Sequence, residues 1–219
     1  MNRSLFQKLS ARIRRDYSAL KGLSESDLAA SPLEQFERWF KQAVSNIPDA
    51  NAMTLATASS DGAPSGRMVL LKDADAQGFV FFTNYDSRKG RELEKNPRAA
   101  LVFPWHALAR QVIVEGRIEK ISAEESDAYF ATRPRDAQIG AWASHQSEIL
   151  EAREALEKRL REVGDRFKGQ TIPRPPHWGG YRLIPAQIEF WQGRANRLHD
   201  RLRYVKSGDG GWMIERLAP

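Results

Sequence analysis

Cysteine is absent from the 219-residue sequence, and histidine and methionine occur only four times each. The lack of cysteine excludes disulfide bonds, thiolate catalysis and cysteine-based zinc sites, and it fits a reducing compartment, so we expect a cytoplasmic protein. None of the four histidines stands in an HExxH or comparable ligand spacing, so no metal site is expected. Walker, GxGxxG and nucleophile-elbow motifs are missing as well.

Long apolar runs are also missing. Runs such as MVLL at 68–71 and FVFF at 79–82 are far shorter than the ~20 residues that a membrane-spanning helix needs. The first 17 residues are rich in arginine and contain no acid before Asp16, a composition that organelle transit peptides share, but they hold no apolar segment typical of secretion. We expect no membrane partner.

Basic residues outnumber acidic ones, which gives a net charge of +6 and a pI near 9.7. This balance favours anionic partners, and nucleic acid has to be considered first. The cations, however, are spread over short motifs with acids between them, and they form neither a basic tail nor a single basic helix. Several small phosphate pockets suit this pattern better, so no nucleic-acid partner is expected.

The spacing of apolar residues predicts many strands and few helices. Ser31 and Glu34 form a capping box at the start of an amphipathic helix, with proline at its first position. Short helices are predicted after Ser87 and after Ser122, and the longest helix at 148–167. Strands are predicted at 52–58, 66–71, 78–83, 99–103, 111–121, 181–184, 188–192, 201–206 and 212–216.

These elements show no βαβ alternation, so we predict a mainly β protein with peripheral helices, in which an antiparallel barrel closes on itself. A chain of this length suffices for one ordinary domain with a substantial core. We assign residues 31–219 to that domain and residues 1–30 to an N-terminal arm.

Two short segments place cations where a phosphate can bind. RMVLLK at 67–72 is a strand with a cation at each end, and because alternate residues of a strand face opposite ways, Arg67 and Lys72 are expected to serve different anions. SRKG at 87–90 puts a capping serine and two cations at a helix N-terminus, which attracts phosphate. Solvated surface charges explain either segment, taken alone, at least as well.

The segment YFATRPRDAQIGAW at 129–142 combines an aromatic helix end with two arginines. Pro134 disfavours helical geometry at Arg133, and a rigid arginine beside the Tyr129 hydroxyl suits bidentate phosphate binding. The alternative is a surface loop in which an arginine pairs with Asp136.

The densest cluster of functional side chains lies at 187–204, QIEFWQGRANRLHDRLRY, where two strand-like segments flank a glycine-containing turn. A planar anionic ligand would explain this cluster, which consists of Trp191, Arg194, Arg197, His199, Arg201 and Arg203. His199 is the only histidine that we place in a site, because it follows Arg197 by two residues and can face the same side.

In their order along the chain, these motifs resemble the pyridoxine/pyridoxamine 5′-phosphate oxidase family. The matching stretches are RRDY from Arg14, RMVLLK from Arg67, SRKG from Ser87, RQVIVEG from Arg110, RPRDAQIGAW from Arg133, HWGGYR from His177, IEFWQG from Ile188, RLHDR from Arg197 and the terminal IERLAP. The resemblance implies an FMN-binding split β-barrel and a homodimer with FMN at the subunit interface, the C-terminal segment serving dimerisation. It further implies oxidation of pyridoxine or pyridoxamine 5′-phosphate to pyridoxal 5′-phosphate, with O2 as acceptor, H2O2 as product and ammonia released from the amine.

The resemblance also implies roles for individual residues. FMN-binding residues would be Arg67, Met68, Val69, Leu70, Leu71, Lys72, Phe82, Thr83, Ser87, Arg88, Lys89, Gln111, Gln146, Ser147, Trp191 and Arg201. Substrate-binding residues would be Lys72, Tyr129, Arg133, Arg197, Leu198, His199, Arg14 and Tyr17, the last two forming a lid. Arg197 and His199 would be catalytic, with His199 either orienting the substrate or assisting proton movement.

One position departs from the family pattern. The family commonly has serine after RPRD, in the stretch that binds the substrate phosphate, whereas this chain has Ala137. We expect weaker substrate binding with retained chemistry. Three alternatives are considered beside the oxidase: a protein on the same barrel that binds FMN or pyridoxal phosphate without turnover, a flavin reductase with a nicotinamide donor, and a basic barrel that binds single-stranded nucleic acid.

Overall fold

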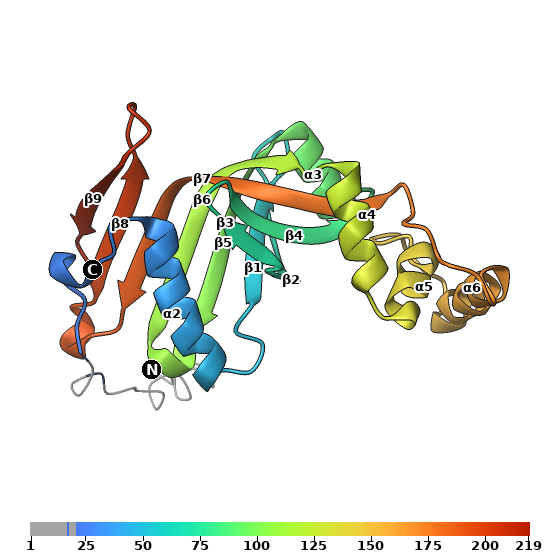
Figure 1. The fold of residues 1–219 in the computed structure, drawn as a ribbon, viewed down its shortest axis with the longest axis horizontal. Coiled ribbons are helices and arrows are strands. Elements are labelled where there is room, and N and C mark those ends of the chain that lie inside the picture. The colour runs from blue at the N-terminus through green and yellow to red at the C-terminus, as the bar shows by residue number, and fades with distance from the viewer. Residues whose placement is uncertain (1–16, 18–20) are drawn as a thin grey trace, which may run out of the picture.

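The structure, a computed structural model, describes Tyr17 and residues 21–219 (Figure 1). Arg14, assigned to the lid, lies outside the described residues. The helices are α2 (Pro32–Asn46), α3 (Arg88–Lys95), α4 (Ala123–Thr132), α5 (Arg135–Ala143) and α6 (Arg153–Arg166), with 3-10 turns η1 (Glu25–Asp27), η2 (His106–Leu108) and η3 (Ala195–Arg197). The strands are β1 (Ala52–Ala58), β2 (Pro64–Leu70), β3 (Asp73–Asp75), β4 (Gly78–Asn84), β5 (Arg98–Trp105), β6 (Arg110–Lys120), β7 (Trp178–Gln192), β8 (Asp200–Lys206) and β9 (Trp212–Leu217).

The strands form one antiparallel sheet that curls into a half-barrel, in the order β2-β1-β5-β6-β7-β4-β3. The first half of β7 pairs with β4 and its second half with β8, which continues into a β8–β9 hairpin beyond the half-barrel. The mainly β fold is confirmed, but the expected closure is wrong. β2 and β4 approach each other without pairing, and this opening between them, the seam, splits the barrel.

Residues 181–192 form part of one strand, β7, where the sequence predicted two short ones. The register shifts between Glu115 and Gly116 of the neighbouring β6, opposite Pro185. A Cβ atom on Gly116 would lie 2.0 Å from the carbonyl oxygen of Ile184, so only glycine allows this approach. The bulge lets β7 continue past Pro185, so that β7 pairs with β4 at one end and with β8 at the other.

Helix α2 covers the half-barrel core, as its capping serine and apolar spacing predicted. Ser31 caps the helix through its side chain. The ring of Phe36 packs 5.0 Å from that of Phe103, and the ring of Trp39 packs edge-on against Phe190 at 5.3 Å. These contacts join the helix to β5 and β7 of the half-barrel.

Helices α4, α5 and α6 pack together at the end of the molecule opposite that hairpin (Figure 1). They share a small core of Phe130, Ala141, Phe167, Ile172 and Trp178. The helix predicted at 148–167 begins only at Arg153, and α2 is longer. Residues 146–147, just before the predicted start, are held against α3 by hydrogen bonds.

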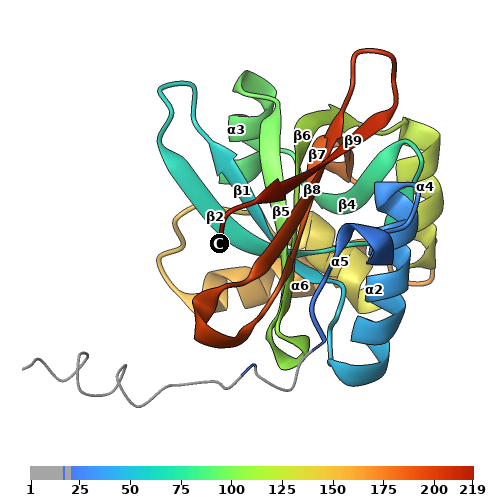
Figure 2. The same ribbon diagram turned by 90° about the vertical axis from the view of Figure 1, so that its left-hand side faces the viewer.

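The segment before α2 runs along the β8–β9 hairpin (Figure 2). The amide of Leu23 donates to Asp200 over 3.0 Å, and Arg216 pairs with Asp200 at 3.0 Å and with Glu25 at 2.8 Å. Residues 21–28, the end of the predicted arm, are thus tied to the hairpin that carries His199.

No helix of the described chain is long and apolar enough to cross a membrane.

Candidate functional site

A cavity of about 1030 Å³ opens at the seam. Its walls come from β2, the end of β4, the start of α3, helices α4 and α5 and residues 144–147. The predicted site residues that line it are Arg67, Met68, Val69, Leu70, Lys72, Phe82, Thr83, Arg88, Lys89, Tyr129, Arg133, Gln146 and Ser147. Segments that lie between residues 65 and 178 of the chain thus line one cavity.

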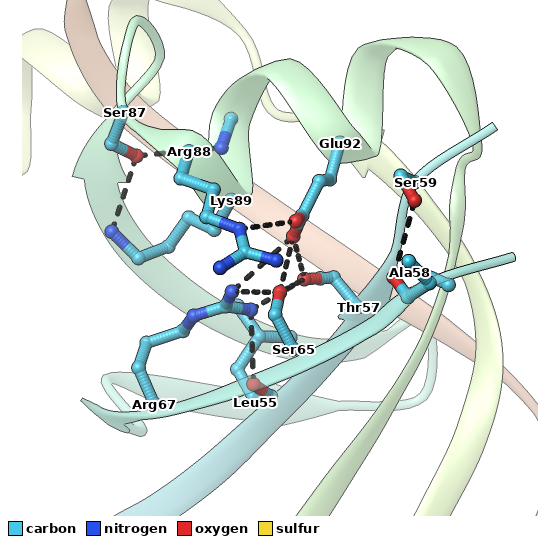
Figure 3. Close-up of polar contacts among 12 residues, drawn as sticks. Leu55, Thr57, Ala58, Ser59, Ser65, Arg67, Ser87, Arg88, Lys89 and Glu92 are labelled. Atoms are coloured by element: carbon cyan, nitrogen blue, oxygen red, sulfur yellow. Dashed lines mark hydrogen bonds and ion pairs between the residues drawn. The ribbon is translucent and has the colours of Figure 1, made fainter. Parts of the chain in front are cut away.

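Three cations gather at the α3 end of the cavity (Figure 3). Arg88 Nε lies 2.8 Å from Glu92 Oε1, and Arg67 Nη2 lies 3.2 Å from Glu92 Oε2. Lys89 follows Arg88 on the same helical turn and also lines the cavity. Because a single carboxylate faces three cations, this cluster keeps a positive charge that favours an anion in the cavity.

The ammonium group of Lys89 is buried among neutral acceptors. It lies 2.7 Å from Gln146 Oε1 and 3.1 Å from the hydroxyls of Thr83 and Ser87. Burial, and then the charge of Arg67, lower the pKa of Lys89 to about 8. An anion beside it would stabilise its charged form, so the donor set fits a phosphate group.

The start of α3 is held by hydrogen bonds and packs closely against the residues that follow β4. Ser87 Oγ accepts the N–H of Gly90 over 3.3 Å, and Ser147 Oγ accepts the N–H of Arg88 over 3.1 Å. A Cβ atom on Gly90 would lie 1.9 Å from the carbonyl oxygen of Tyr85, so only glycine lets the helix start so close to the end of β4. The predicted capped helix is confirmed, and its two cations are held at the cavity.

Arg133 stands at the α4–α5 end of the cavity. It keeps an extended backbone before Pro134, as the sequence predicted, and its guanidinium lies 4.6 Å from the centre of the Trp178 ring. Its Nη1 atom is buried and has no hydrogen-bond partner among the described residues. Burial lowers the pKa of Arg133. A partly desolvated cation on the wall of a cavity, without a carboxylate partner among the described residues, is suited to bind an anion.

Lys72 and Tyr129 lie on the same side of the cavity as Arg133. The Lys72 ammonium is 6.0 Å from the centre of the Tyr129 ring, which stacks on Phe82 at 3.9 Å. Lys72 was expected to lie on the face of one strand opposite to that of Arg67. Instead β2 ends at Leu70, and because β2 is an edge strand the cavity extends past its end, so both cations line it. That the two cations serve different anions stays a prediction.

The remaining predicted residues do not line the cavity. Leu71 packs into the half-barrel core, and Ser87 is buried beneath the Lys89 ammonium, to which it is hydrogen-bonded. Gln111, Trp191 and Arg201 lie side by side on β6, β7 and β8. Arg201 forms a two-point ion pair with Glu189, at 2.8 and 3.0 Å.

His199 is held in one orientation at the start of the β8–β9 hairpin. Its Nδ1 accepts the backbone N–H of Arg194 over 3.0 Å, and its ring lies 4.6 Å from that of Trp191. The ring of Tyr17 meets it edge-on at 5.8 Å. Because Nδ1 is an acceptor here, the neutral ring carries its proton on Nε2.

Arg197 and Leu198 project from the turn before His199. Asn196 and Arg197 have positive φ angles of 57° and 62°, a strained backbone that presents their side chains outward. The Leu198 side chain is 67% exposed, and Arg197 is exposed too. Figure 1 shows the hairpin and helices α4–α6 at opposite ends of the molecule, so these residues and the cavity of the same chain are far apart.

Sequence reasoning missed three residues around the cation cluster. Glu92 is buried and bound by Arg67 and Arg88, and the hydroxyls of Thr57 and Ser65 also donate to it. The spacing of Arg88 and Glu92 by four residues is a usable signal for a pair on one helix face. Nothing local in the sequence connects Thr57 with them. No group of three potential metal ligands occurs in the described part of the chain.

Two family models match the chain. Residues 40–167 match the model described as pyridoxamine 5′-phosphate oxidase, and residues 178–219 match the pyridoxine 5′-phosphate oxidase C-terminal dimerisation region. A relative from Paraburkholderia phymatum, named pyridoxine/pyridoxamine 5′-phosphate oxidase, is 59% identical over 95% of this chain and 98% of its own length. A relative of the same name from Trichormus variabilis is 57% identical over the same shares.

Solved structures agree with this result. The chain superposes on PhzG from Burkholderia lata, determined in complex with tetrahydrophenazine-1-carboxylic acid, with a TM-score of 0.85, 34% identity and coverage of 93% of this chain and 100% of that one. It superposes on an FMN-binding, pyridoxamine 5′-phosphate oxidase-related protein from Nostoc punctiforme with a TM-score of 0.70, over 88% of this chain and 100% of that one, at 17% identity. The second likeness concerns the fold alone.

The antiparallel half-barrel has the fold of the FMN-binding split-barrel class, and the family models and named relatives make the protein an oxidoreductase of that class. The chain belongs to the pyridoxamine 5′-phosphate oxidase family. The predicted family, the split-barrel fold and FMN as the cofactor are confirmed with it.

Proposed function

We propose that the protein is an FMN-dependent oxidase that converts pyridoxine or pyridoxamine 5′-phosphate to pyridoxal 5′-phosphate, with O2 as acceptor and H2O2 as product. The observation that carries this proposal is one cavity with two sets of cations on different elements. Arg67, Arg88 and Lys89 form the first set, and Lys72 and Arg133 form the second. A cofactor and a substrate that each carry one phosphate would occupy both sets.

The first set would hold the FMN phosphate. Lys89, whose charge is destabilised by burial, and the two arginines supply donors on one side, while the hydroxyl of Ser147 and the amide of Gln146 border the same space. When bound, FMN supplies the acceptor for the hydride that leaves C4′ of the substrate and passes the electrons to O2. The chain itself positions the reactants and excludes water.

The second set would hold the substrate phosphate. The guanidinium of Arg133 would gain an acceptor there, and Lys72 would add a second charge. The stacked rings of Tyr129 and Phe82 form an apolar wall beside them. A phosphorylated substrate fits this end of the cavity better than a nicotinamide donor, which leaves the flavin reductase as the less favoured alternative.

The hairpin residues would reach the cavity of a second copy in a homodimer with FMN at the subunit interface. Residues 178–219 match the family's dimerisation region, and this range contains Trp191, Arg197 and His199. An exposed apolar side chain lies at the cavity and another at the hairpin: Met68 is 73% exposed and Leu198 is 67% exposed. A two-fold axis would bring the hairpin of each chain to the cavity of the other.

In this assembly His199 would orient the substrate and would not act as a base. Its Nδ1 is occupied by the N–H of Arg194, so the neutral ring offers Nε2–H as a donor towards the oxygen or nitrogen on C4′. Arg197 would hold the substrate ring in place beside it. The proton lost by the alcohol or amine then has to leave through another acceptor, such as water.

Anaerobic flavin reduction tests the proposal. Pyridoxamine 5′-phosphate is added to the FMN-loaded protein, the flavin absorbance is followed, and O2 is then admitted. We expect bleaching, recovery in O2, and formation of pyridoxal 5′-phosphate, H2O2 and ammonia. A flavin that remains oxidised with both the alcohol and the amine would refute the oxidase assignment in favour of a binding protein, and bleaching only by a nicotinamide donor would identify a reductase.

Restoring a hydroxyl at Ala137 is expected to tighten substrate binding. Ala137 lines the cavity from the first turn of α5, so a serine there can donate one neutral hydrogen bond, worth about 1 kcal/mol or roughly fivefold in affinity. Steady-state kinetics of Ala137→Ser should show a lower KM with nearly unchanged kcat. Ala131→Ser, exposed on α4 outside the cavity, is the control, and equal KM values for the two variants would contradict the assignment.

FMN affinity is expected to fall as the pH rises through about 8. Only protonated Lys89 attracts the phosphate, and its pKa in the free protein is about 8, so above that pH proton uptake opposes binding by up to about tenfold per unit. Fluorescence titration with FMN between pH 6.5 and 9.5 should show the fall, whereas riboflavin, which lacks the phosphate, should show none. A Lys89→Met variant whose FMN affinity declines as steeply would disprove the role of Lys89.

A further inference from the structure

Glu92 is the one carboxylate that contacts the cation cluster in the described chain. Its side chain is 7% exposed, and its Oε2 atom accepts hydrogen bonds from Ser65 at 2.6 Å and from Thr57. Arg67 binds the same oxygen at 3.2 Å, while Arg88 binds Oε1 at 2.8 Å (Figure 3). Both carboxylate oxygens are therefore used, and each holds an arginine that lines the cavity.

The contacts fix each arginine differently. Arg88 is 60% exposed, so without the Glu92 carboxylate its long side chain would be free to turn into solvent. Arg67, 20% exposed, also donates to the carbonyl oxygen of Leu55 at 3.2 Å and to the hydroxyl of Ser65. Glu92 thus connects an arginine on β2 with one on α3, across the gap between a strand and a helix.

We propose that Glu92 is a positioning residue for the cofactor phosphate: it orients Arg67 and Arg88 towards the cavity before the cofactor binds. This inference rests on the proposed function, because it takes the phosphate of FMN as the anion of the cluster.

The charge of Glu92 has two opposite effects on an incoming phosphate. It repels the phosphate directly, but it is turned away from the cavity: both its oxygens are occupied by donors, and Glu92 does not line the cavity. It also holds two arginines in a geometry that an anion would otherwise have to impose on them, at a cost in side-chain entropy. The second effect acts through direct contacts and outweighs the first.

The charge of Glu92 also affects FMN binding through the protonation of Lys89. The charged groups that face its ammonium are Arg67 from β2 and Glu92 from α3, and the neutral acceptors are Thr83 from β4, Ser87 and Gln146. Arg67 disfavours the charged ammonium and Glu92 favours it. Removing the Glu92 charge therefore leaves Lys89 opposed by Arg67 alone, and the lysine loses its proton at a lower pH.

Glu92→Gln keeps the size of the side chain and removes its charge. We expect FMN to bind about ten- to hundredfold more weakly to the apoprotein, since two charge-assisted hydrogen bonds become neutral ones. Riboflavin affinity should change little, because riboflavin makes no contact with the cluster. The pH at which FMN affinity begins to fall should also move downward. Glu92→Asp, which keeps the charge, should restore the pH of the fall even if the affinity recovers only in part.

Glu94→Gln is the matched control, since it makes the same charge change at an exposed position of the same helix. Equal loss of FMN and riboflavin affinity in Glu92→Gln, without a shift of the pH profile, would reveal a merely structural role and overturn the inference. The inference would also be overturned if Glu92→Gln bound FMN as tightly as Glu94→Gln does. Wild-type protein that does not prefer FMN over riboflavin would instead overturn the proposed function itself.

Discussion

Replacing Arg133 by leucine is expected to raise the KM for pyridoxamine 5′-phosphate by roughly 100-fold or more, with a much smaller change in kcat. Arg133 lines the cavity and has no carboxylate partner among the described residues, so its guanidinium would meet the substrate phosphate with two charge-assisted hydrogen bonds. Together these are worth about 3 kcal/mol or more, which corresponds to at least ~100-fold in affinity. Steady-state kinetics over a wide substrate range measures the change.

The same substitution should leave the stability of the apoprotein unchanged or raise it. Arg133 is desolvated, and its charge is unpaired in the described residues apart from the rings of Trp178 and Phe130. A buried cation without a counterion costs free energy, which leucine does not. Thermal unfolding without substrate should therefore show an equal or higher Tm.

Arg135→Leu is the control, with the opposite expectation. Arg135 donates to the carbonyl oxygens of Phe167 at 2.6 Å and Gln170 at 3.0 Å, and so joins α5 to the end of α6 outside the cavity. Its loss should lower Tm and leave KM nearly unchanged. If Arg135→Leu raised KM as much as Arg133→Leu does, or if Arg133→Leu left KM unchanged, Arg133 would not be the phosphate ligand.

Much of the fold could be predicted because its signals are local. Ser31, Ser87 and Ser122 accept hydrogen bonds at the helix starts that the sequence placed there, and the antiparallel strands follow the alternating apolar runs. The seam could not be predicted in this way. Whether β2 pairs with β4 depends on the curl of the whole sheet, which no segment encodes alone.

The residues of the candidate site likewise differ in whether a local sequence signal predicts them. Arg88, Lys89 and Arg133 could be identified because a helix cap and a proline fix their backbones locally. The shared cavity of Arg67 and Lys72 was not predictable, since strand alternation separates the two faces and only the end of an edge strand reunites them. Glu92 was missed for a related reason: its partners lie on three separate elements.

The active site should reassemble from two chains that are each inactive. Arg67→Met removes a cation from the cavity and Arg197→Met removes one from the hairpin, and we expect both homodimers to have little activity. In a purified heterodimer of the two variants, one site would combine both defects and the other would have neither. The heterodimer should then have about half the activity of the wild-type dimer.

This expectation follows from where the two residues lie. Arg67 borders the seam, whereas Arg197 projects from the β8–β9 hairpin at the end of the molecule opposite α4–α6, so both cannot face one substrate from the same chain (Figure 1). Different affinity tags on the two chains allow the heterodimer to be isolated from the parents. Its kcat per dimer and its flavin content, expected at about one FMN per dimer, are then measured.

A heterodimer of Arg67→Met with Lys89→Met is the control. Both substitutions lie in the cavity, so each of its two sites would carry one of them and no intact site would form. Activity in the Arg67→Met/Arg197→Met heterodimer but not in this control can arise only if the cavity of one chain works with the hairpin of the other. If neither heterodimer exceeds its parents, each site is built within a single chain, and the hairpin residues have to be removed from it.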